Sequence, residues 1–305
     1  MTCATDYQPA IARTVSMASL TTFAIGGPVA VHTIDDLDQL AAVHDRPHRW
    51  LGAGANLLVA DAGVPEPVLT LGRRYAGCHW QVLEDGRLRV RAGAAVALPR
   101  LIQRCLRRGA GGLEDLAAIP GSLGGALWMN AGPPGRGLAE RLRRLRWWCP
   151  RQRRACWSWR EQLPVAYRGA GLSEGAVILA VEFDLAPRPV ADLRAEFIAA
   201  RRRKAASQPL ASASAGCVFR NPAPDQSAGR LLDEIGTKGW RCGDAVVSPQ
   251  HANFIINAGR ATAAEVCALI DRLRRHAWRE RRVALEPEIV FWGCGPSDDI
   301  MQEDR

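Results

Sequence analysis

Two spacings of apolar residues alternate along the chain. Apolar residues three to four positions apart are typical of amphipathic helices, and alternation at every second position is typical of strands. We therefore expect helices at residues 35–43, 98–108, 191–206 and 262–282, and strands at residues 87–91, 176–185, 254–257 and 284–291. No internal repeat or low-complexity segment interrupts this order, so the pattern predicts an α+β chain.

Several of these elements carry signals for their ends or for their burial. Gly109 ends the second helix, and the spacing of Thr262 and Glu265 predicts a capping box at the start of the last one. One apolar stripe of that helix consists of Val266, Leu269, Ile270 and Leu273. The strand at 176–185 is apolar almost throughout, which predicts a central place in its sheet.

Length and composition indicate a globular protein of two or three domains. The chain has 305 residues, of which 48% are apolar and 6% aromatic. Pro187 and Pro189 break the chain and predict a domain boundary there. No apolar run approaches the roughly 20 residues needed to cross a bilayer, and residues 1–13 lack the order of a secretory signal. We expect a cytoplasmic protein without membrane insertion.

The nine cysteines are scattered, without a CxxC pair or a Cys/His ligand spacing. Because their number is odd and their spacing irregular, we expect neither a disulfide framework nor a metal site. Eight of them we interpret as small buried hydrophobes or inert thiols. Cys217 differs, because Arg220 and Asn221 follow it closely.

Net charge is +9 and is carried almost entirely by arginine. The densest block, residues 141–160, also contains Trp147, Trp148, Trp157 and Trp159. Basic residues interleaved with aromatic ones can bind nucleic acid. Because no nucleic-acid module motif is present, we favour a twisted strand pair with a solvated arginine face and expect no nucleic-acid partner. The positive field can still help to collect an anionic substrate.

Two glycine-rich turns, residues 51–58 and 118–132, are the most informative feature of the sequence. Glycine permits backbone conformations in which N–H groups converge on an anion without a side chain in the way. Either turn alone also fits an ordinary bend in a large α/β protein. Two of them in one chain favour a long diphosphate ligand such as a dinucleotide.

The second half of the chain contains the candidate reactive groups. A thiol at Cys217 precedes Arg220 and Asn221, and residues 285–289 place two carboxylates two positions apart, hence on one face of a strand. Each pattern has a plain structural alternative: a buried core thiol, or an acidic strand edge with a proline. The polar clusters Tyr167-Arg168-Gly169 and His251-Ala252-Asn253 also fit ordinary loops.

In their order along the chain, these motifs resemble a known family. The matching segments are residues 22–27, both glycine turns, Tyr167-Arg168, and residues 208–210, 217–222, 245–257 and 285–288. Spanning residues 20–292, they resemble UDP-N-acetylenolpyruvoylglucosamine reductase (UDP-N-acetylmuramate dehydrogenase), the MurB family of peptidoglycan synthesis. The absence of a long insertion after Arg168 resembles the shorter subtype, which lacks an extra substrate-covering loop.

This resemblance implies a vanillyl-alcohol-oxidase/PCMH-type two-part FAD-binding fold followed by an α+β substrate-binding domain. No strand-GxGxxG-helix unit is present, which agrees with a fold other than Rossmann. The implied domains are residues 1–72 and 73–187 for the two FAD-binding subdomains, and 188–305 for the substrate. The implied FAD-binding residues are Gly52, Gly54, Ala55, Asn56, Leu57, Pro120, Gly121, Ser122, Gly124 and Gly125.

The resemblance also implies an activity: reduction by NADPH, through FAD, of the enolpyruvyl ether of UDP-N-acetylglucosamine. By similarity, Arg168 and a protonated Glu288 stabilise the charge that develops on the substrate carboxylate. Cys217 stands where the family usually has serine and is the implied proton donor. Implied substrate-binding residues are Tyr167, Arg220, Asn221 and His251. We expect a monomer or a weak oligomer that binds a UDP-sugar.

The sequence departs from the family pattern near the expected site. Pro133-Pro134-Gly135 replaces Ala-Tyr-Gly, Gly169-Ala170 replaces Asp-Ser, and Ala55 replaces serine. These departures leave open a MurB-like flavoenzyme for a different enolpyruvyl or nucleotide-linked substrate. The arginine- and tryptophan-rich block leaves open a basic, non-catalytic flavin-binding protein.

Overall fold

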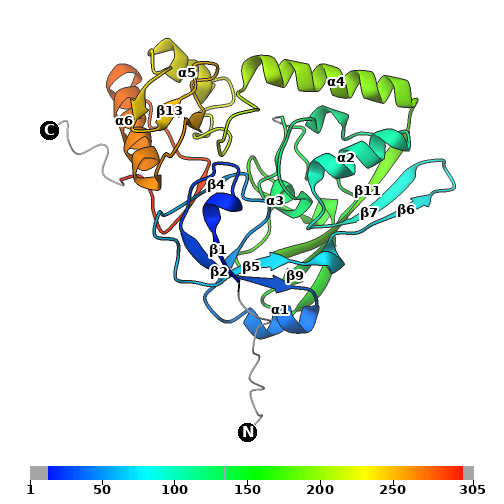
Figure 1. Cartoon of the computed structure of the whole chain (residues 1–305). Coiled ribbons are helices and arrows are strands. Elements are labelled where there is room, and N and C mark those ends of the chain that lie inside the picture. The colour runs from blue at the N-terminus through cyan, green and yellow to red at the C-terminus, as the bar shows by residue number, and fades with distance from the viewer. Residues whose placement is uncertain (1–12, 134, 298–305) are drawn as a thin grey trace, which may run out of the picture. The chain divides into compact units, whose positions relative to one another are not determined.

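The computed structural model describes residues 13–133 and 135–297, and it divides into two compact units (Figure 1). Unit 1 contains Val31–Ala53 and Pro67–Arg203, and unit 2 contains Thr14–Ala30, Gly54–Glu66 and the chain from Lys204 onward. The chain therefore passes between the units several times before it enters unit 2 for good. The three-part division at residues 72 and 187 stays a prediction.

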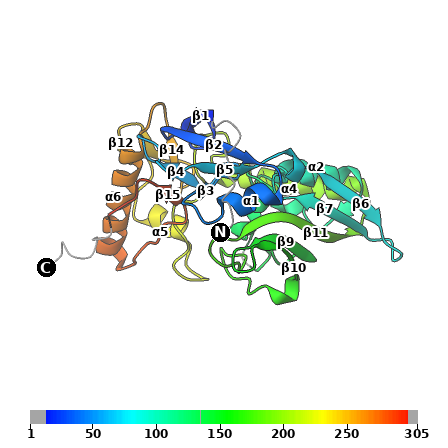
Figure 2. The same cartoon turned by 90° about the horizontal axis from the view of Figure 1, so that it is seen from below.

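Unit 1 is built on a large sheet whose strand order is β10-β9-β11-β7-β6, with β8 also paired to β11 (Figure 2). The strands are β6 (Cys78–Val82), β7 (Leu88–Gly93), β8 (Ala110–Gly111), β9 (Arg144–Cys149), β10 (Arg154–Trp159) and β11 (Val177–Pro187). All these pairs are antiparallel. The central place predicted for the apolar strand is confirmed, because β11 lies between β9 and β7.

One face of this sheet carries the main core of unit 1. Helices α2 (Leu98–Arg107) and α3 (Leu123–Trp128) lie over this sheet (Figure 1). Their buried side chains share one core with Val181 and Phe183 of β11. The buried positions of α2 are Leu98, Leu101, Ile102, Cys105 and Leu106. Their spacing is the one that predicted this helix, and Gly109 follows its end with a positive φ of 66°. Helix α4 (Val190–Ser207) is confirmed within a residue at each end.

On the opposite face, charged and aromatic side chains are paired in register. Glu182 of β11 is 1% exposed and lies between Arg91 of β7 and Arg144 of β9, with ion-pair distances of 2.6 and 2.5 Å. The Arg144 guanidinium stacks over Trp157 and Trp159 of β10, at 4.3 and 5.5 Å from the ring centroids. The predicted strand pair is confirmed, and its arginines neutralise buried carboxylates as well as facing solvent.

Asp184 is expected to make the stability of unit 1 pH-dependent. Its carboxylate accepts hydrogen bonds from Arg89 at 2.7 and 2.8 Å and from Arg143 at 2.7 Å, and these guanidinium groups lower its pKa to about 2. The ordinary value is 3.8, so the ionised carboxylate stabilises the fold by about 2 kcal/mol above pH ~5. That contribution is lost as the pH falls through about 4 towards about 2.

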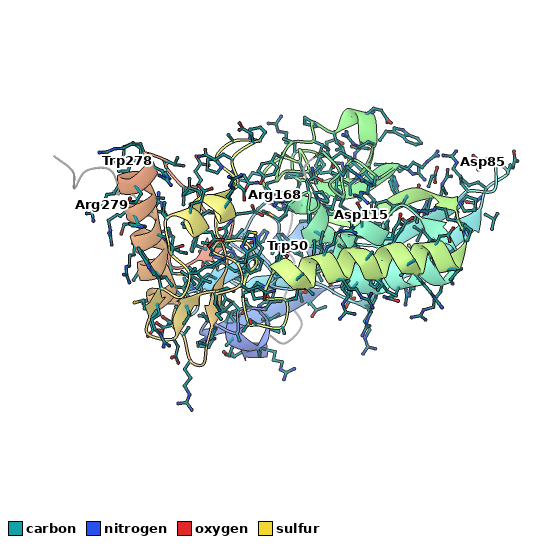
Figure 3. All side chains as sticks on the ribbon, turned by 90° about the horizontal axis from the view of Figure 1, so that it is seen from above. Trp50, Asp85, Asp115, Arg168, Trp278 and Arg279 are labelled. Carbon is teal, nitrogen blue, oxygen red and sulfur yellow. The ribbon has the colours of Figure 1, made fainter. Side chains whose placement is uncertain are left out.

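Urea unfolding of Asp184→Asn at several pH values tests this. The variant is expected to be less stable than the parent by about 2 kcal/mol at pH 7, with the difference shrinking towards pH 2. Asp85→Asn serves as the control, because Asp85 is half-exposed at the tip of the β6–β7 hairpin (Figure 3). A difference for Asp184→Asn that does not change with pH would contradict the prediction.

A smaller sheet has the order β1-β2-β5-β3 and includes β1 (Arg13–Ser16), β2 (Pro28–Ile34), β3 (Arg49–Trp50) and β5 (Val68–Leu71). Its strands β2, β5 and β3 run parallel. Helix α1 (Leu37–Val43) follows β2 and is confirmed at its predicted place. It begins there because the Asp36 carboxylate caps it, accepting a hydrogen bond from Gln39 N–H at 2.8 Å.

Unit 2 packs α5 (Ala228–Glu234) and α6 (Ala263–Arg281) around one core. The strands that lie wholly within this unit are β4 (Leu57–Val59), β12 (Arg241–Cys242), β13 (Ala245–Val247), β14 (Ile255–Asn257) and β15 (Val290–Trp292). The capping box of Thr262 and Glu265 is confirmed, and the predicted apolar stripe of α6 is buried. Trp278 and Arg279 lie in the last turns of this helix (Figure 3).

The strand expected at 284–291 is wrong over most of its length. Regular pairing begins only at Val290, where β15 runs parallel to β4. Before it, Pro287 forms an isolated bridge with Phe219. Because proline has no N–H group, it cannot continue a ladder of hydrogen bonds. Glu286 and Glu288 therefore belong to an irregular segment rather than to one strand face.

The cysteines in the described residues are free thiols. Cys105, Cys149 and Cys267 are buried, and burial raises the pKa of Cys105 to about 12, as expected for an inert thiol. Within residues 13–133 and 135–297, no cluster of three His, Cys, Asp or Glu side chains has the arrangement of a metal site. In the same ranges, no helix is both long and apolar enough to cross a membrane.

Candidate active site

The two glycine-rich turns approach each other within unit 1. A Cβ atom on Gly52 would lie 2.7 Å from the Ser122 Oγ, so any side chain at this position would force the serine hydroxyl to move. Ser122 itself caps α3, with its Oγ accepting from Gly125 N–H at 3.2 Å. The structure therefore brings Gly52 of the first predicted turn next to Ser122 of the second.

Some backbone N–H groups of the second glycine-rich turn already donate hydrogen bonds within unit 1. The N–H groups of Leu123 and Gly124 donate to Val96 and Ala94 carbonyls at 2.7 and 2.9 Å. A Cβ on Gly124 would lie 2.9 Å from that of Ala94, so this glycine serves close packing. Pro120 is exposed at the start of the turn. The N–H groups of Gly121 and Ser122 have no donor role in the described residues and remain for a ligand.

Arg168 stands at the corner of a tight turn in unit 1. Ala166 and Gly169 exchange both backbone hydrogen bonds across this turn, at 3.0 and 3.2 Å. Arg168 adopts a φ of 59°, which is uncommon outside glycine and costs conformational energy. Its guanidinium lies 5.0 Å from the centroid of the Tyr167 ring, and that tyrosine is 49% exposed. The turn therefore presents both residues of the predicted pair together, and Figure 3 shows the place of Arg168.

Asn130 is hydrogen-bonded to the backbone of this turn. Its side chain is 5% exposed and donates to the Ala166 carbonyl at 3.0 Å and to Glu140 Oε1 at 3.2 Å. Its Oδ1 accepts from Ala139 N–H at 2.9 Å. The sequence contains Asn130 in a matched motif, but we did not predict a site role for it. The signal available in the sequence was an asparagine within a glycine-rich turn, because asparagine tolerates the left-handed conformation that it adopts here, with a φ of 43°.

A cavity of about 200 Å³ opens beside the Arg168 turn, entirely within unit 1. It is lined by Asn130, Gly132, Pro133, Gly135, Gly137, Glu140, Val165, Ala166, Tyr167 and Arg168. The Arg168 guanidinium donates to the Gly132 carbonyl at 3.4 Å. One of the sequence departures, Pro133, thus lines the cavity that holds the predicted cation.

In unit 2, the end of the first glycine turn holds the backbone of Glu288. Asn56 Nδ2 donates to the Glu288 carbonyl at 3.1 Å, and the Asn56 carbonyl accepts from Val290 N–H at 3.0 Å. Leu57 begins β4, which pairs with β15. Gly54 has a φ of 61° and its carbonyl accepts from Thr22 N–H, while Ala55 is half-buried. Predicted cofactor and catalytic residues are neighbours here.

Cys217 and Glu288 lie on adjoining backbone segments of unit 2. The Glu288 N–H donates to the Val218 carbonyl at 2.7 Å, and Cys217 forms an isolated bridge with Phe254. Both side chains are half-buried. Arg220 is exposed, and its N–H donates to the Glu286 carbonyl at 2.9 Å. The structure therefore brings the predicted proton donor and the predicted acid into the same small region.

His251 is held as a neutral ring with a defined tautomer. Asn253 N–H donates to His251 Nδ1 at 3.2 Å, so the neutral ring carries its proton on Nε2. Burial lowers the pKa of His251, and the charge of Lys238 lowers it further. A Cβ on Gly229 would lie 2.7 Å from the ring, so α5 packs closely against it. Asn221 accepts from Ala228 N–H at 3.1 Å and thereby supports the start of α5.

The chain is similar to known proteins over most of its length. Residues 16–151 match the FAD binding domain family, and residues 208–292 match the family described as UDP-N-acetylenolpyruvoylglucosamine reductase, C-terminal domain. UDP-N-acetylenolpyruvoylglucosamine reductase of Thermus thermophilus is 37% identical over 287 residues, covering 91% of this chain and 98% of that one. The chain belongs to the UDP-N-acetylenolpyruvoylglucosamine reductase family.

Two further relatives agree with this assignment. UDP-N-acetylenolpyruvoylglucosamine reductase 2 of Symbiobacterium thermophilum is 39% identical over 286 residues, which are 90% of each chain. The crystal structure of the reductase MurB from Thermus caldophilus superposes with a TM-score of 0.80 at 34% identity, over 92% of this chain and 98% of that one. The predicted family is confirmed, as is the fold class, a PCMH/VAO-type FAD-binding fold with a C-terminal α+β domain. Members of this reductase family use FAD and NADPH.

Proposed function

We propose that this chain reduces the enolpyruvyl ether of UDP-N-acetylglucosamine to UDP-N-acetylmuramate with electrons from NADPH. Membership in the reductase family over nine-tenths of the chain carries this proposal. The fold holds Cys217 and Glu288 on adjoining segments and presents Arg168 at a sharp turn, which supports it further. The UDP-sugar is the proposed small-molecule partner, and a monomeric or weakly oligomeric state stays a prediction.

The glycine-rich turns fit the diphosphate of FAD. Gly52 leaves room beside Ser122 that any side chain would fill, and the N–H groups of Gly121 and Ser122 are available to an anion. Asn56 and Leu57 belong to the same set, which we propose for the cofactor. When bound, FAD supplies the carrier that passes a hydride from NADPH to the substrate.

The substrate dictates what the protein residues must do. Its carbon–carbon double bond is conjugated to a carboxylate, so hydride adds at the methylene end and negative charge develops towards the carboxylate. Arg168 and a protonated Glu288 are proposed to hold that carboxylate and stabilise the charge before it develops. Because a guanidinium stays charged at every relevant pH, Arg168 needs no neighbour to activate it.

Cys217 is proposed to complete the reaction by giving a proton to the carbon beside the carboxylate. A thiol has a lower pKa than a hydroxyl and can donate at least as readily. Its sulfur is larger and forms weaker hydrogen bonds than the serine oxygen usual in the family. Tyr167, Arg220, Asn221 and His251 are proposed to bind the nucleotide sugar, with the His251 Nε2–H as a hydrogen-bond donor.

A flavin absorbance spectrum and an NADPH oxidation assay of the purified protein test this proposal. The purified protein is expected to be yellow, to show a flavin absorbance spectrum, and to release FAD on denaturation, because the site holds the cofactor without a covalent link. Without substrate it is expected to oxidise about one NADPH per FAD, and to turn over NADPH continuously only when UDP-N-acetylglucosamine enolpyruvate is added. A colourless protein that FAD does not reconstitute would contradict the cofactor assignment. FAD binding with no response to this substrate would contradict the proposed reaction.

A further inference from the structure

Asn253 is a buried residue that hydrogen-bonds to His251 and to the segment between Cys217 and Arg220. It is 3% exposed, and it belongs to the segment that connects β13 to β14 in unit 2. The Oδ1 accepts from Phe219 N–H at 2.9 Å, and the Nδ2 donates to the Phe219 carbonyl at 2.9 Å. Its backbone carbonyl accepts from Val218 N–H at 2.9 Å, and its backbone N–H donates to His251 Nδ1 at 3.2 Å.

The amide of Asn253 takes the place of a strand. It satisfies both backbone groups of Phe219, as the residue opposite in an antiparallel ladder would. On its other side, the same segment is held by Glu288 N–H on the Val218 carbonyl and by Arg220 N–H on the Glu286 carbonyl, at 2.7 and 2.9 Å. The stretch between Cys217 and Arg220 therefore has hydrogen bonds along both edges.

We propose that Asn253 is a positioning residue that sets the place of the Cys217 thiol relative to Glu288. The inference rests on the proposed function and adds a determinant of the substrate half-reaction. A single amide is well suited to this task, because it offers a donor and an acceptor side by side. Through its backbone N–H, Asn253 also selects the His251 tautomer that carries hydrogen on Nε2.

Loss of the Nδ2 donor alone is expected to disturb this arrangement. Asn253→Asp keeps the acceptor for Phe219 N–H but sets a carboxylate oxygen against the Phe219 carbonyl, so the two repel. A displacement of about 1 Å can slow a reaction by about a hundredfold when reacting groups must be aligned. We expect the oxidation of pre-reduced holoenzyme by UDP-N-acetylglucosamine enolpyruvate to slow by about 10- to 100-fold at pH 8, with FAD reduction by NADPH changed less than about twofold.

A pH profile separates positioning from general damage. Burial beside a carbonyl favours the protonated form of the introduced carboxyl. Once protonated, it again donates to the Phe219 carbonyl, so the variant is expected to recover rate relative to the parent as the pH falls towards 5. The rate of Cys217 alkylation by iodoacetamide, followed by peptide mass spectrometry, is expected to differ from the parent at pH 8 and to approach it at pH 5.

Asn257→Asp is the matched control at the far end of β14. Its Oδ1 accepts from Gly259 and Ala261 N–H groups, and its Nδ2 donates to the Phe23 carbonyl at 3.3 Å. The aspartate change there also keeps the acceptor and removes the donor. It is expected to affect urea unfolding without changing either half-reaction or Cys217 alkylation.

Parent holoenzyme that does not respond to UDP-N-acetylglucosamine enolpyruvate would defeat the proposed function itself. If the parent responds, a substrate half-reaction of Asn253→Asp equal to that of the parent at pH 8 would overturn the inference. Equal slowing of both half-reactions would also overturn it, since Asn253 would then be only structural. Asn253→Ser provides the same comparison, without the pH recovery, if the aspartate variant does not fold.

Discussion

Replacing Cys217 by alanine is expected to slow the substrate half-reaction by about two to four powers of ten, the usual contribution of general acid catalysis. Pre-reduced holoenzyme mixed with UDP-N-acetylglucosamine enolpyruvate gives this rate from the recovery of flavin absorbance. The alanine variant retains the cofactor contacts, so FAD reduction by NADPH is expected to stay close to the parent. Protonation of the carbon beside the carboxylate is the step that loses its donor.

Cys217→Ser is the matched comparison, because it restores a hydroxyl donor of nearly the same shape. Appreciable turnover is expected from this variant. Alkylation of the parent thiol is expected to inactivate the enzyme, and bound substrate is expected to slow that alkylation. An alanine variant as active as the parent would mean that Cys217 only packs in the fold and that another group or water supplies the proton.

Arg168→Ala and Glu288→Gln are expected to have the second large effect, about two to three powers of ten on the same half-reaction. Each removes a group proposed to stabilise charge on the substrate carboxylate without replacing a residue of either glycine turn. Arg168→Ala also removes the hydrogen bond to the Gly132 carbonyl at the end of the second turn. Rapid mixing with NADPH alone, followed by mixing of reduced enzyme with substrate, separates the two halves. FAD reduction is expected to change little in either variant.

Glu286→Gln is the control for the acidic segment. Glu286 is exposed, two positions before Glu288, and its backbone carbonyl contact with Arg220 survives the substitution. It is expected to match the parent in both halves of the reaction. Equal losses in FAD reduction and reoxidation for Glu288→Gln would argue for a structural role of this side chain instead.

Local sequence signals were sufficient for most helices and for the central strand. The capping box of Thr262 and Glu265, the spacing of the α2 core residues and the apolar run of β11 each act within one element. Such signals are readable because one helix face or one strand contains the whole pattern. The two glycine turns were readable for the same reason.

Contacts between distant segments were not predictable in this way. Leu57 and Val290 pair in a parallel sheet although 233 positions separate them, and no local pattern announces that pairing. Pro287 is visible in the sequence, but its effect on the expected strand is not. Only the structure shows that it forms an isolated bridge with Phe219 and that regular pairing begins after it. No structural role for Asn130 or for Asn253 was readable from the sequence, because each holds a backbone group that lies more than 30 positions away along the chain.

Unit 2 combines segments from the beginning and the end of the chain, and this affects when it can fold during synthesis. Its core contains Phe23, Ile25 and Leu58 from the first sixty residues together with Leu285 and Ile289 near the end. The early apolar side chains therefore wait for their partners until translation is nearly complete, and they must be kept from other hydrophobic surfaces meanwhile. A fragment that begins at Lys204 would lack these three side chains, so the core around the C-terminal family domain would be incomplete in it.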